Sequence, residues 1–380
     1  MTPANAEDLV ADGFGTVADA FRRTVREPDR SGAALSIWLD GVPIVESQAG
    51  TADPAAGRRY RTDTLTRIFS GTKGLAAIAI GMLVERGLLP SWDVPVADFW
   101  PGFAAYGKGR VTIGDVLAHR AGLSAPRRPP RTEQVLDELA LADILAAQEP
   151  LWRPGEHHQY HALTLGALTS KLIQNATGES FRRFLDREVL DPLGADVWVG
   201  LPPDQHARLS VLLDDPGPVR DRTGDIEALL WVDRANTLHG ACSLDDYRTA
   251  AVMSAGLASA GGVATASGVA RVWSATVTPT KGVRLLRDTT VQRMCRPRSV
   301  GMPRFAEYIE GPWNSWGAGV MIPSDKLKML SSASFGHEGL GGQLTFADSD
   351  ARVGFAYLTN QMGDFDRAAS VVEALAGALG

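Results

Sequence analysis

Cysteine is scarce in this chain, and long apolar runs are missing from it. The 380 residues include two cysteines, Cys242 and Cys295, which lie far apart and have no metal-binding or redox partner at short spacing. We therefore expect two reduced, buried thiols rather than a disulfide framework. No uninterrupted apolar run approaches the length of about eighteen residues that a membrane-spanning helix needs. The sequence thus argues against the disulfide-rich secreted class and predicts no membrane span.

An excess of basic charge is also missing. The formal net charge is −6, and both signs are spread along the chain, which argues against nucleic acid or an anionic membrane as a partner. The one basic run, "APRRPPRTE", is proline-rich and typical of a solvated surface loop. The first residues, "MTPANAEDLVADGF", are acidic where a secretory signal carries a basic segment and then an apolar one. We therefore expect a cytoplasmic protein.

Signatures of several common enzyme classes are absent. The chain has no G-x-S-x-G nucleophile elbow, no P-loop and no strand-associated G-x-G-x-x-G fingerprint. Histidines gather at His157, His158 and His161, but no second cluster of histidine, cysteine or carboxylate at ligand spacing accompanies them. We therefore expect no metal and no cofactor.

The order of predicted elements places β-structure at both ends of the chain. Residues 7–26 have apolar positions at helical spacing, and "AALSIWLDGVPIVESQAG" predicts two strands joined at Asp40-Gly41. Helical patterns dominate the middle. The last eighty residues return to the strand patterns "WGAGVMIP", "GGQLTFAD" and "ARVGFAYLTNQ", followed by an amphipathic helix, "DRAASVVEALAGAL".

This order predicts an α/β (α+β) fold in which helices flank an antiparallel sheet. We expect residues 1–75 and 300–380 to build the sheet subdomain and residues 76–299 to form a mainly helical inserted subdomain. Together they would make a single catalytic domain over residues 1–380. Ligand sites are common where two such parts meet, so a cleft is expected between them.

The stretch "FSGTKG" places Ser70 three residues before Lys73, at the start of the apolar run "LAAIAIGMLVERGLL". Ser70 is a candidate helix N-cap, because serine is favoured at that position. Lys73 favours a second interpretation, since the first turn of a helix disfavours a cation. Residues i and i+3 share a helix face, so the amine can reach the Ser70 hydroxyl. A buried amine beside a helix N-terminus loses affinity for its proton and can act as a base.

Two further segments supply candidate partners. Tyr160, in "WRPGEHHQYHALTLGAL", lies between a Pro-Gly turn and a helical run, where it is either a core tyrosine or a phenol that relays a proton. In "FGHEGLGGQLTFADSD", His337 and Gly339 begin a strand pair, and glycine in a strand marks a close backbone approach. The backbone N–H of Leu340 could then join that of Ser70 as an oxyanion donor. A tight turn with an incidental histidine is the alternative.

The ordered segments "SGTK", "YHA" and "HEG" resemble those of the serine β-lactamase and penicillin-binding protein superfamily. With the flanking stretches "VLAHRAGL", "WRPGEHHQYHALTLG" and "FGHEGLGGQLTFAD", the chain is most similar to the class C-like esterase branch, the family VIII carboxylesterases. The resemblance covers the chain from about residue 30 onwards. It implies a Ser70 nucleophile, proton handling by Lys73 and Tyr160, and an edge strand that carries His337–Gly339 beside the cleft. The family's fold agrees with the predicted layout.

The chain departs from the β-lactamase pattern at two positions. Ala162 stands where β-lactamases usually carry an asparagine amide, and His337 stands where they usually carry lysine. Both changes remove groups that hold the amide and the carboxylate of a β-lactam, so they favour esters. Glu338 places an anion near the pocket, which would disfavour anionic substrates if its side chain faces the cleft.

These observations predict a serine hydrolase that forms a covalent acyl-enzyme at Ser70 and cleaves a small carboxylic ester or lactone. Amide or β-lactam hydrolysis, or acyl transfer, is an alternative that uses the same site. A binding protein that keeps the fold without catalysis is the alternative from another class. Tryptophans are candidates for an apolar pocket, although aromatic residues are more often core. They are Trp152, which we assign to substrate binding, and Trp231, Trp313 and Trp316.

Overall fold

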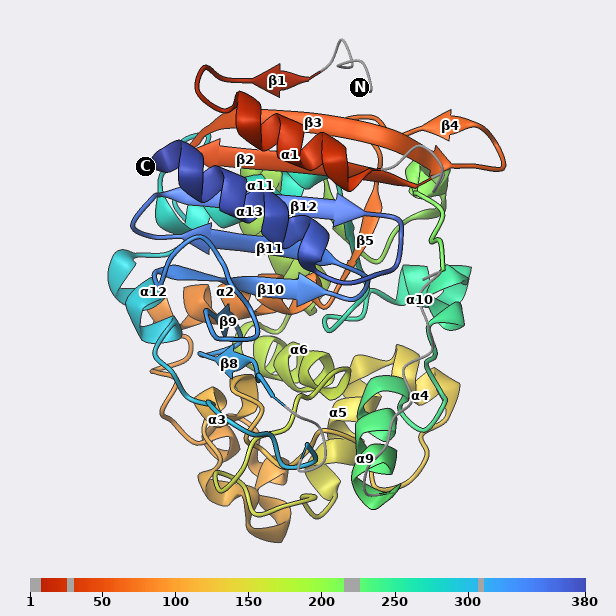
Figure 1. Ribbon diagram of the computed structural model, residues 1–380. Coiled ribbons are helices and arrows are strands. Elements are labelled where there is room, and N and C mark those ends of the chain that lie inside the picture. The colour runs from red at the N-terminus through yellow and green to blue at the C-terminus, as the bar shows by residue number, and fades with distance from the viewer. Residues whose placement is uncertain (1–7, 26–30, 215–225, 307–310) are drawn as a thin grey trace.

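The computed structural model describes residues 8–25, 31–214, 226–306 and 311–380. A large antiparallel sheet occupies one half of the molecule, and most helices lie in the other half (Figure 1). Its strand order is β1-β3-β2-β12-β11-β10-β9-β8, with β4 paired to β3. The strands are β1 Leu9–Val10, β2 Gly32–Leu39, β3 Val42–Asp53, β4 Arg58–Arg59, β8 Ser315–Trp316, β9 Met321–Ile322, β10 Ser334–Gly339, β11 Gln343–Asp348 and β12 Val353–Thr359.

The two ends of the chain meet inside this sheet. Strand β2 pairs antiparallel with β12 over seven residue pairs, from Leu39↔Val353 to Ala33↔Thr359. Strands β2 and β3 form the predicted hairpin, and both turn residues adopt positive φ, 52° at Asp40 and 79° at Gly41. That conformation is the one a two-residue hairpin turn requires, which explains the Asp-Gly pair. The predicted fold class is confirmed.

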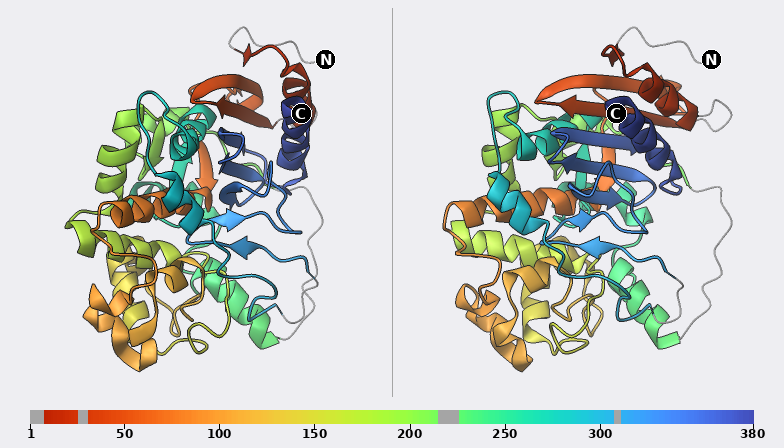
Figure 2. Two further views of the ribbon diagram at one scale, coloured as in Figure 1. Left: turned by 90° about the vertical axis from the view of Figure 1, so that its left-hand side faces the viewer. Right: turned by 60° about the vertical axis from the view of Figure 1, so that its left-hand side comes forward.

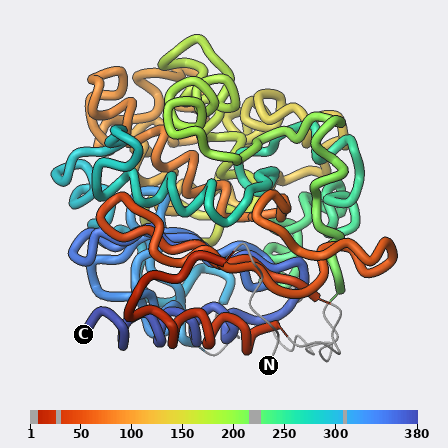
Figure 3. The backbone as a smooth tube through the Cα atoms, turned by 90° about the horizontal axis from the view of Figure 1, so that it is seen from above, coloured from red at the N-terminus to blue at the C-terminus, as the bar shows by residue number. Residues whose placement is uncertain are grey.

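Helices cover both faces of the sheet. Helices α1 (Gly15–Thr24) and α13 (Asp366–Leu379) lie side by side on one face, as Figure 3 shows from above. They share a core with the sheet aromatics Phe346 and Phe355. Helices α2 (Gly71–Glu85) and α11 (Ala266–Val277) cover the other face (Figure 2).

The remaining helices lie outside these two layers, most of them in the lower part of Figure 1. They are α3 Ile113–Leu117, α4 Thr132–Leu136, α5 Glu138–Ala147, α6 Thr164–Thr177, α7 Phe181–Leu185, α8 Asp191–Leu193, α9 Ile226–Thr237, α10 Ala250–Ala255 and α12 Asp288–Met294. Short 3₁₀ segments are Val96–Asp98, Pro101–Arg110, Pro203–Arg208 and Asp245–Arg248, and a π turn spans Asp186–Leu190. A small sheet of order β5-β7-β6 (β5 Thr66–Phe69, β6 Val197–Val199, β7 Gly262–Ala264) joins the two parts.

Helix α11 lies within the range 76–299 that the sequence assigns to the helical part, yet it packs on the large sheet. Gly354 of β12 makes this contact possible, because a Cβ there would lie 2.4 Å from the Ala270 carbonyl oxygen. Trp273 of α11 also meets Phe335 of β10 edge-on. We therefore group α11 with the sheet and keep the remaining subdomain boundary as a proposal.

No helix among the described residues is long and apolar enough to cross a membrane. The same part of the chain contains no group of three or more histidine, cysteine or carboxylate side chains placed to hold a metal ion.

Candidate active site

A strained turn presents Ser70 at the junction of β5 and α2. Phe69 has a φ of 45°, which is rare for a residue with a bulky side chain. Thr72 fixes this conformation, because its hydroxyl donates to the Phe69 carbonyl oxygen at 2.6 Å and accepts from the Gly262 N–H at 2.9 Å. Backbone strain of this kind gathers at functional sites.

The Ser70 hydroxyl contacts both side chains that the sequence analysis places beside it. Its Oγ lies 3.1 Å from Lys73 Nζ and 2.9 Å from the Tyr160 hydroxyl oxygen. Ser70 occupies the N-cap position of α2, but its side chain makes no capping hydrogen bond. The capping interpretation of Ser70 therefore does not account for its side chain.

Lys73 is almost fully buried, with 1% of its surface exposed. Besides Ser70, its Nζ contacts the Ser259 carbonyl oxygen, to which it donates at 2.8 Å. Burial lowers the pKa of the Lys73 amine well below its usual value, and the Glu138 carboxylate opposes that shift. Because the effect of burial dominates, the uncharged form of the amine is favoured.

The turn that carries the Ser259 carbonyl is anchored from two sides. The Ser259 hydroxyl donates to the Leu163 carbonyl oxygen at 2.5 Å and accepts from the Gly166 N–H at 2.6 Å. The Glu138 carboxylate accepts from the Ala258 N–H at 2.8 Å. The acceptor of the Lys73 amine is therefore fixed by helices α5 and α6.

Tyr160 lies in a cluster of rings. It stacks on Trp316, with ring centroids 5.2 Å apart and an interplanar angle of 17°, and Lys73 Nζ lies 5.0 Å from its ring centroid. Burial raises the pKa of the Tyr160 phenol, the hydrogen bond to Ser70 opposes the rise, and the Glu338 charge adds to it. The phenol is therefore protonated at neutral pH.

Strand β10 brings its motif against the nucleophile turn. A Cβ on Gly339 would lie 2.3 Å from the Ile68 carbonyl oxygen, so only glycine allows the strand to approach this closely. Leu340, which follows at the turn into β11, lies at the cleft wall and is 52% exposed. The predicted close backbone approach is therefore present, and its partner is the chain just before Ser70.

His337 and Glu338 point to opposite faces of β10. His337 pairs with Thr345 and packs near Trp316, with ring centroids 5.5 Å apart. Glu338 pairs with Leu344, which belongs to the core on the α1 and α13 face. Since strand side chains alternate, the Glu338 side chain lies on the opposite face of β10 from His337, and Glu338 is also among the residues that line the cleft.

Both residues have shifted acidities. Burial raises the pKa of the Glu338 carboxyl to about 7, while Lys326 opposes the rise. Burial lowers the pKa of His337 to about 3, so its ring is neutral. Its Nδ1 lies 2.6 Å from the Glu338 carbonyl oxygen and donates to it, and among the described residues Nε2 has no hydrogen-bond partner. His337 thus brings an acceptor, and no positive charge, to the cleft.

These residues line a cleft of about 630 Å³. Its walls are mostly apolar and aromatic, and they include Phe69, Ala162, Leu163, Cys242, Leu244, Tyr247, Pro312, Trp313, Trp316, Met321 and Phe365. A volume and a lining of this kind fit a small organic molecule. Asn236, Thr237, Ser243, Asn314 and Lys326 add polar groups around the walls.

The molecule has relatives along its whole length. A family model described as beta-lactamase matches residues 17–378. The chain belongs to the β-lactamase family. One relative, esterase/beta-lactamase LipL of Mycobacterium tuberculosis, is 30% identical over 366 residues, which cover 92% of this chain and 81% of the relative.

Solved structures of the β-lactamase family agree. A family VIII carboxylesterase superposes with a TM-score of 0.86 at 29% identity, covering 97% of this chain and 98% of that one. A penicillin-binding protein homologue from Caulobacter crescentus superposes with a TM-score of 0.88 at 29% identity, covering 99% and 100% of the two chains. The resemblance inferred from the three ordered segments is therefore confirmed.

In this member of the β-lactamase family, Trp152 is not among the residues that line the cleft. Its Nε1 donates to the His157 carbonyl oxygen at 3.0 Å, and its ring packs edge-on against Phe305 and His161. Its assignment to substrate binding stays a prediction.

Sequence reasoning also missed several residues of this β-lactamase-family site. The Ser259 carbonyl carries no side-chain signal, and Tyr247 stands in a segment without a motif. The role of Thr72 in holding the turn could have been considered, because Thr72 lies inside the quoted "FSGTKG" stretch. The sequence also predicts that loops of the inserted part, among them residues 200–240, set the size of the pocket. Residues 215–225 of that segment lie outside the described residues.

Proposed function

We propose that this protein is a serine carboxylesterase that forms a covalent acyl-enzyme at Ser70. The observation that carries the proposal is the Ser70 hydroxyl shared between the buried Lys73 amine and the Tyr160 phenol. Family membership and relatives named as esterases support the reaction class. The chain is accordingly an ester hydrolase of the β-lactamase fold.

The proton positions follow from the two pKa shifts. Lys73 Nζ lies within hydrogen-bond distance of the Ser70 hydroxyl, so a neutral amine can take the hydroxyl proton, while the protonated Tyr160 phenol donates a hydrogen bond to the same oxygen. Ser70 Oγ attacks the ester carbonyl carbon as its proton moves to Lys73 Nζ. The tetrahedral intermediate then expels the alkoxide, which takes a proton that Lys73 supplies through Tyr160.

We assign the oxyanion site to the backbone N–H groups of Ser70 and Leu340. Gly339 supports this assignment, since its lack of a side chain lets β10 lie against the nucleophile turn. In the second half-reaction a water molecule gives its proton to the Lys73 and Tyr160 pair and attacks the acyl carbon. Ser70 then leaves with a proton, and the carboxylic acid is released.

The cleft favours uncharged esters over substrates that need a cationic anchor. His337 is neutral because burial lowers its pKa to about 3, and Ala162 has no side-chain amide. A carboxylate or a β-lactam amide therefore finds fewer partners here than an ester with apolar acyl and alcohol groups. We propose small, largely apolar esters or lactones as the substrate class.

The test is the initial rate on p-nitrophenyl butyrate at pH 8 for wild type and Ser70→Ala. We expect turnover to fall by at least about 10⁴-fold in the variant, because nucleophile loss leaves only binding and the oxyanion site. A fluorophosphonate probe should label the wild-type chain at Ser70 and not the variant.

Ser47→Ala is the matched control. Ser47 is fully buried in β3, and among the described residues its hydroxyl has no hydrogen-bond partner. Its replacement should leave the rate within about twofold. Full activity in Ser70→Ala would refute the proposed nucleophile.

A further inference from the structure

His119 lies directly against the proposed proton relay. It is fully buried, two residues after the end of α3. Its ring meets Tyr160 edge-on, with centroids 5.0 Å apart at 69°, and meets Trp316 at 4.3 Å and 77°. The two rings that stack on each other are therefore both held from one side by a single imidazole.

His119 also binds the backbone on both sides of Tyr160. Its carbonyl oxygen accepts from the Gln159 N–H at 3.0 Å. Its ring Nδ1 accepts from the His161 N–H at 3.1 Å. One residue thus binds the N–H groups of the residues before and after the tyrosine and also contacts the tyrosine ring.

These contacts define the charge and tautomer of the ring. Because Nδ1 accepts a hydrogen bond, the proton of the neutral imidazole lies on Nε2. Among the described residues this Nε2 has no hydrogen-bond partner. Burial, together with the nearby His161 and Lys73, lowers the pKa of His119 well below its usual value and keeps it neutral.

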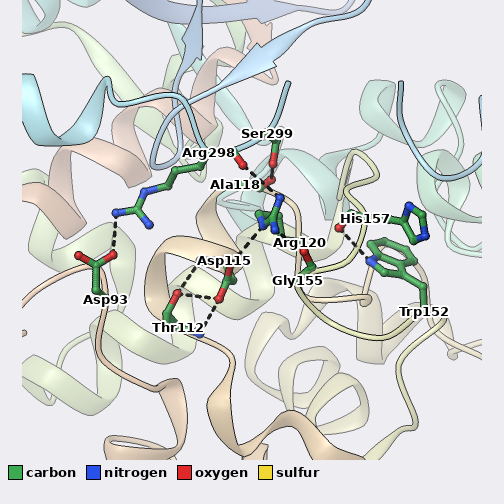
Figure 4. Close-up of polar contacts among 10 residues, drawn as sticks. All are labelled: Asp93, Thr112, Asp115, Ala118, Arg120, Trp152, Gly155, His157, Arg298 and Ser299. Carbon is green, nitrogen blue, oxygen red and sulfur yellow. Dashed lines mark hydrogen bonds and ion pairs between the residues drawn. The ribbon is translucent and has the colours of Figure 1, made fainter. Parts of the chain in front are cut away.

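His119 is itself held in an unfavourable backbone conformation, with a φ of 65°. The residues on both sides of it, Ala118 and Arg120, are held by hydrogen bonds, as Figure 4 shows. The Ser299 hydroxyl donates to the Ala118 carbonyl oxygen at 2.6 Å. The Arg120 guanidinium donates to the carbonyl oxygens of Gly155 and Arg298. Backbone strain kept in this way, next to a reacting group, points to a role beyond packing.

We propose that His119 is a positioning residue that holds the Tyr160 phenol on Ser70 Oγ. It touches neither substrate nor the reacting atoms, and it acts only through the tyrosine. The inference rests on the role proposed above for Tyr160. Without the His119 imidazole, the Tyr160 ring loses its edge-on contact and the His161 N–H loses its acceptor, and we expect the 2.9 Å contact between phenol and serine to be lost.

The test is a double-mutant cycle on p-nitrophenyl butyrate with Tyr160→Phe, His119→Ala and the combined variant. We expect Tyr160→Phe and His119→Ala each to lower kcat by about 100-fold while KM changes by less than about threefold. The combined variant should be no slower than Tyr160→Phe alone, because His119 has nothing left to position.

A second variant separates positioning from folding. His119→Asn tolerates positive φ, and its side-chain oxygen can accept from the His161 N–H. It should recover part of the kcat that His119→Ala loses. If His119→Ala does not fold, His119→Asn takes its place in the double-mutant cycle. Val371→Ala, in the buried α13 core on the far face of the sheet, controls for lost stability and should lower Tm without lowering kcat.

The outcomes are distinct. If the kcat losses of the two single variants multiply in the combined variant, or if His119→Ala keeps wild-type kcat, the inference is wrong. If Tyr160→Phe alone keeps wild-type kcat, the proposed role of Tyr160 fails, and the inference fails with it. If Tyr160→Phe is slow and His119→Ala is not, only the inference about His119 fails.

Discussion

The acidity of Lys73 depends on the few groups that its amine contacts. Two of them, the Ser259 carbonyl and the Ser70 hydroxyl, are neutral. The negative charge of the Glu138 carboxylate opposes the lowering of the Lys73 pKa. Burial raises the pKa of Glu138 itself to about 7. The amine is therefore uncharged at a pH where a surface lysine carries a proton.

The first prediction concerns the pH dependence that follows. Activity requires the neutral amine, so kcat/KM should rise with pH along a limb set by Lys73, well below the pKa of an ordinary lysine. No descending limb should appear near neutrality, because the pKa of Tyr160 is raised. Glu138→Gln removes a carboxylate that raises the Lys73 pKa, so the limb should move to lower pH.

The control is Glu149→Gln, which changes an exposed carboxylate paired with Arg127 at 3.4 Å. It should leave the limb in place. Rate profiles from pH 5 to 10 on p-nitrophenyl butyrate measure both variants. A limb that moves to higher pH in Glu138→Gln would contradict the role given to that carboxylate.

The residues that we propose to react could be identified from the sequence. The residues that hold them in place could not. Ser70 and Lys73 are linked by helical periodicity, and Tyr160 and His337 stand in ordered segments. His119 was present in the quoted "VLAHRAGL", but its positive φ and its contacts across the fold follow from tertiary packing. Neither composition nor spacing encodes such contacts.

At the scale of elements, the site depends on how closely β10 approaches the turn between β5 and α2. That approach exists because Gly339 presents no side chain to the Ile68 carbonyl oxygen. The strand in turn carries His337 and leads into Leu340, so a shift of β10 moves a whole wall of the cleft.

We predict that Gly339→Ala lowers kcat by about 100-fold, because a displacement of roughly 1 Å between a reacting group and its partners costs that much. The matched control is Gly377→Ala in α13, where a Cβ would meet nothing within 4 Å. Alanine there should raise stability by up to about 1 kcal/mol and leave kcat unchanged. Kinetics and thermal melts of the two variants check this. Equal kcat in both would show that β10 tolerates the shift.

The predicted helices and strands agree with the structure where the hydrophobic periodicity extends over many residues. They disagree where a glycine interrupts the periodicity. The hairpin at Asp40-Gly41 and the final helix α13 are confirmed. The run "WGAGVMIP" holds only the last residue of the two-residue strand β8, Trp316, and the two-residue strand β9, because the chain reverses at Gly319 with a φ of 82°. Helix α11 shows a second limit, since periodicity identifies a helix without showing which face of the molecule it covers.

At the scale of the whole molecule, Asn360 ties together segments more than 300 residues apart. Its Oδ1 accepts from the Gly32 N–H at 2.8 Å, and its Nδ2 donates to the Thr51 carbonyl oxygen at 3.0 Å. The side chain is 1% exposed, so its partners would stay unsatisfied without it.

Asn360→Ala should therefore lower the free energy of unfolding by roughly 2–4 kcal/mol, the cost of leaving buried polar groups unpaired. At 25 °C the folded fraction should keep its kcat within about twofold, because the residue is remote from the cleft wall. Asn175→Ala, whose exposed amide donates to the Phe99 carbonyl oxygen, should cost less than about 0.5 kcal/mol. Denaturant melts measure the free energy of unfolding of the two variants. Similar losses of stability in both would contradict the role given to Asn360.

The pairing of β2 with β12 has a consequence for the nascent chain. The ribosome delivers Ser70 and Lys73 early, but β10 and the central partner of β2 emerge only once residues up to 359 have been made. Pairing at such sequence separation is slow to form. If Ser70 is the nucleophile, as we propose, it leaves the exit tunnel as an ordinary alcohol and becomes reactive only when synthesis has passed the last strand.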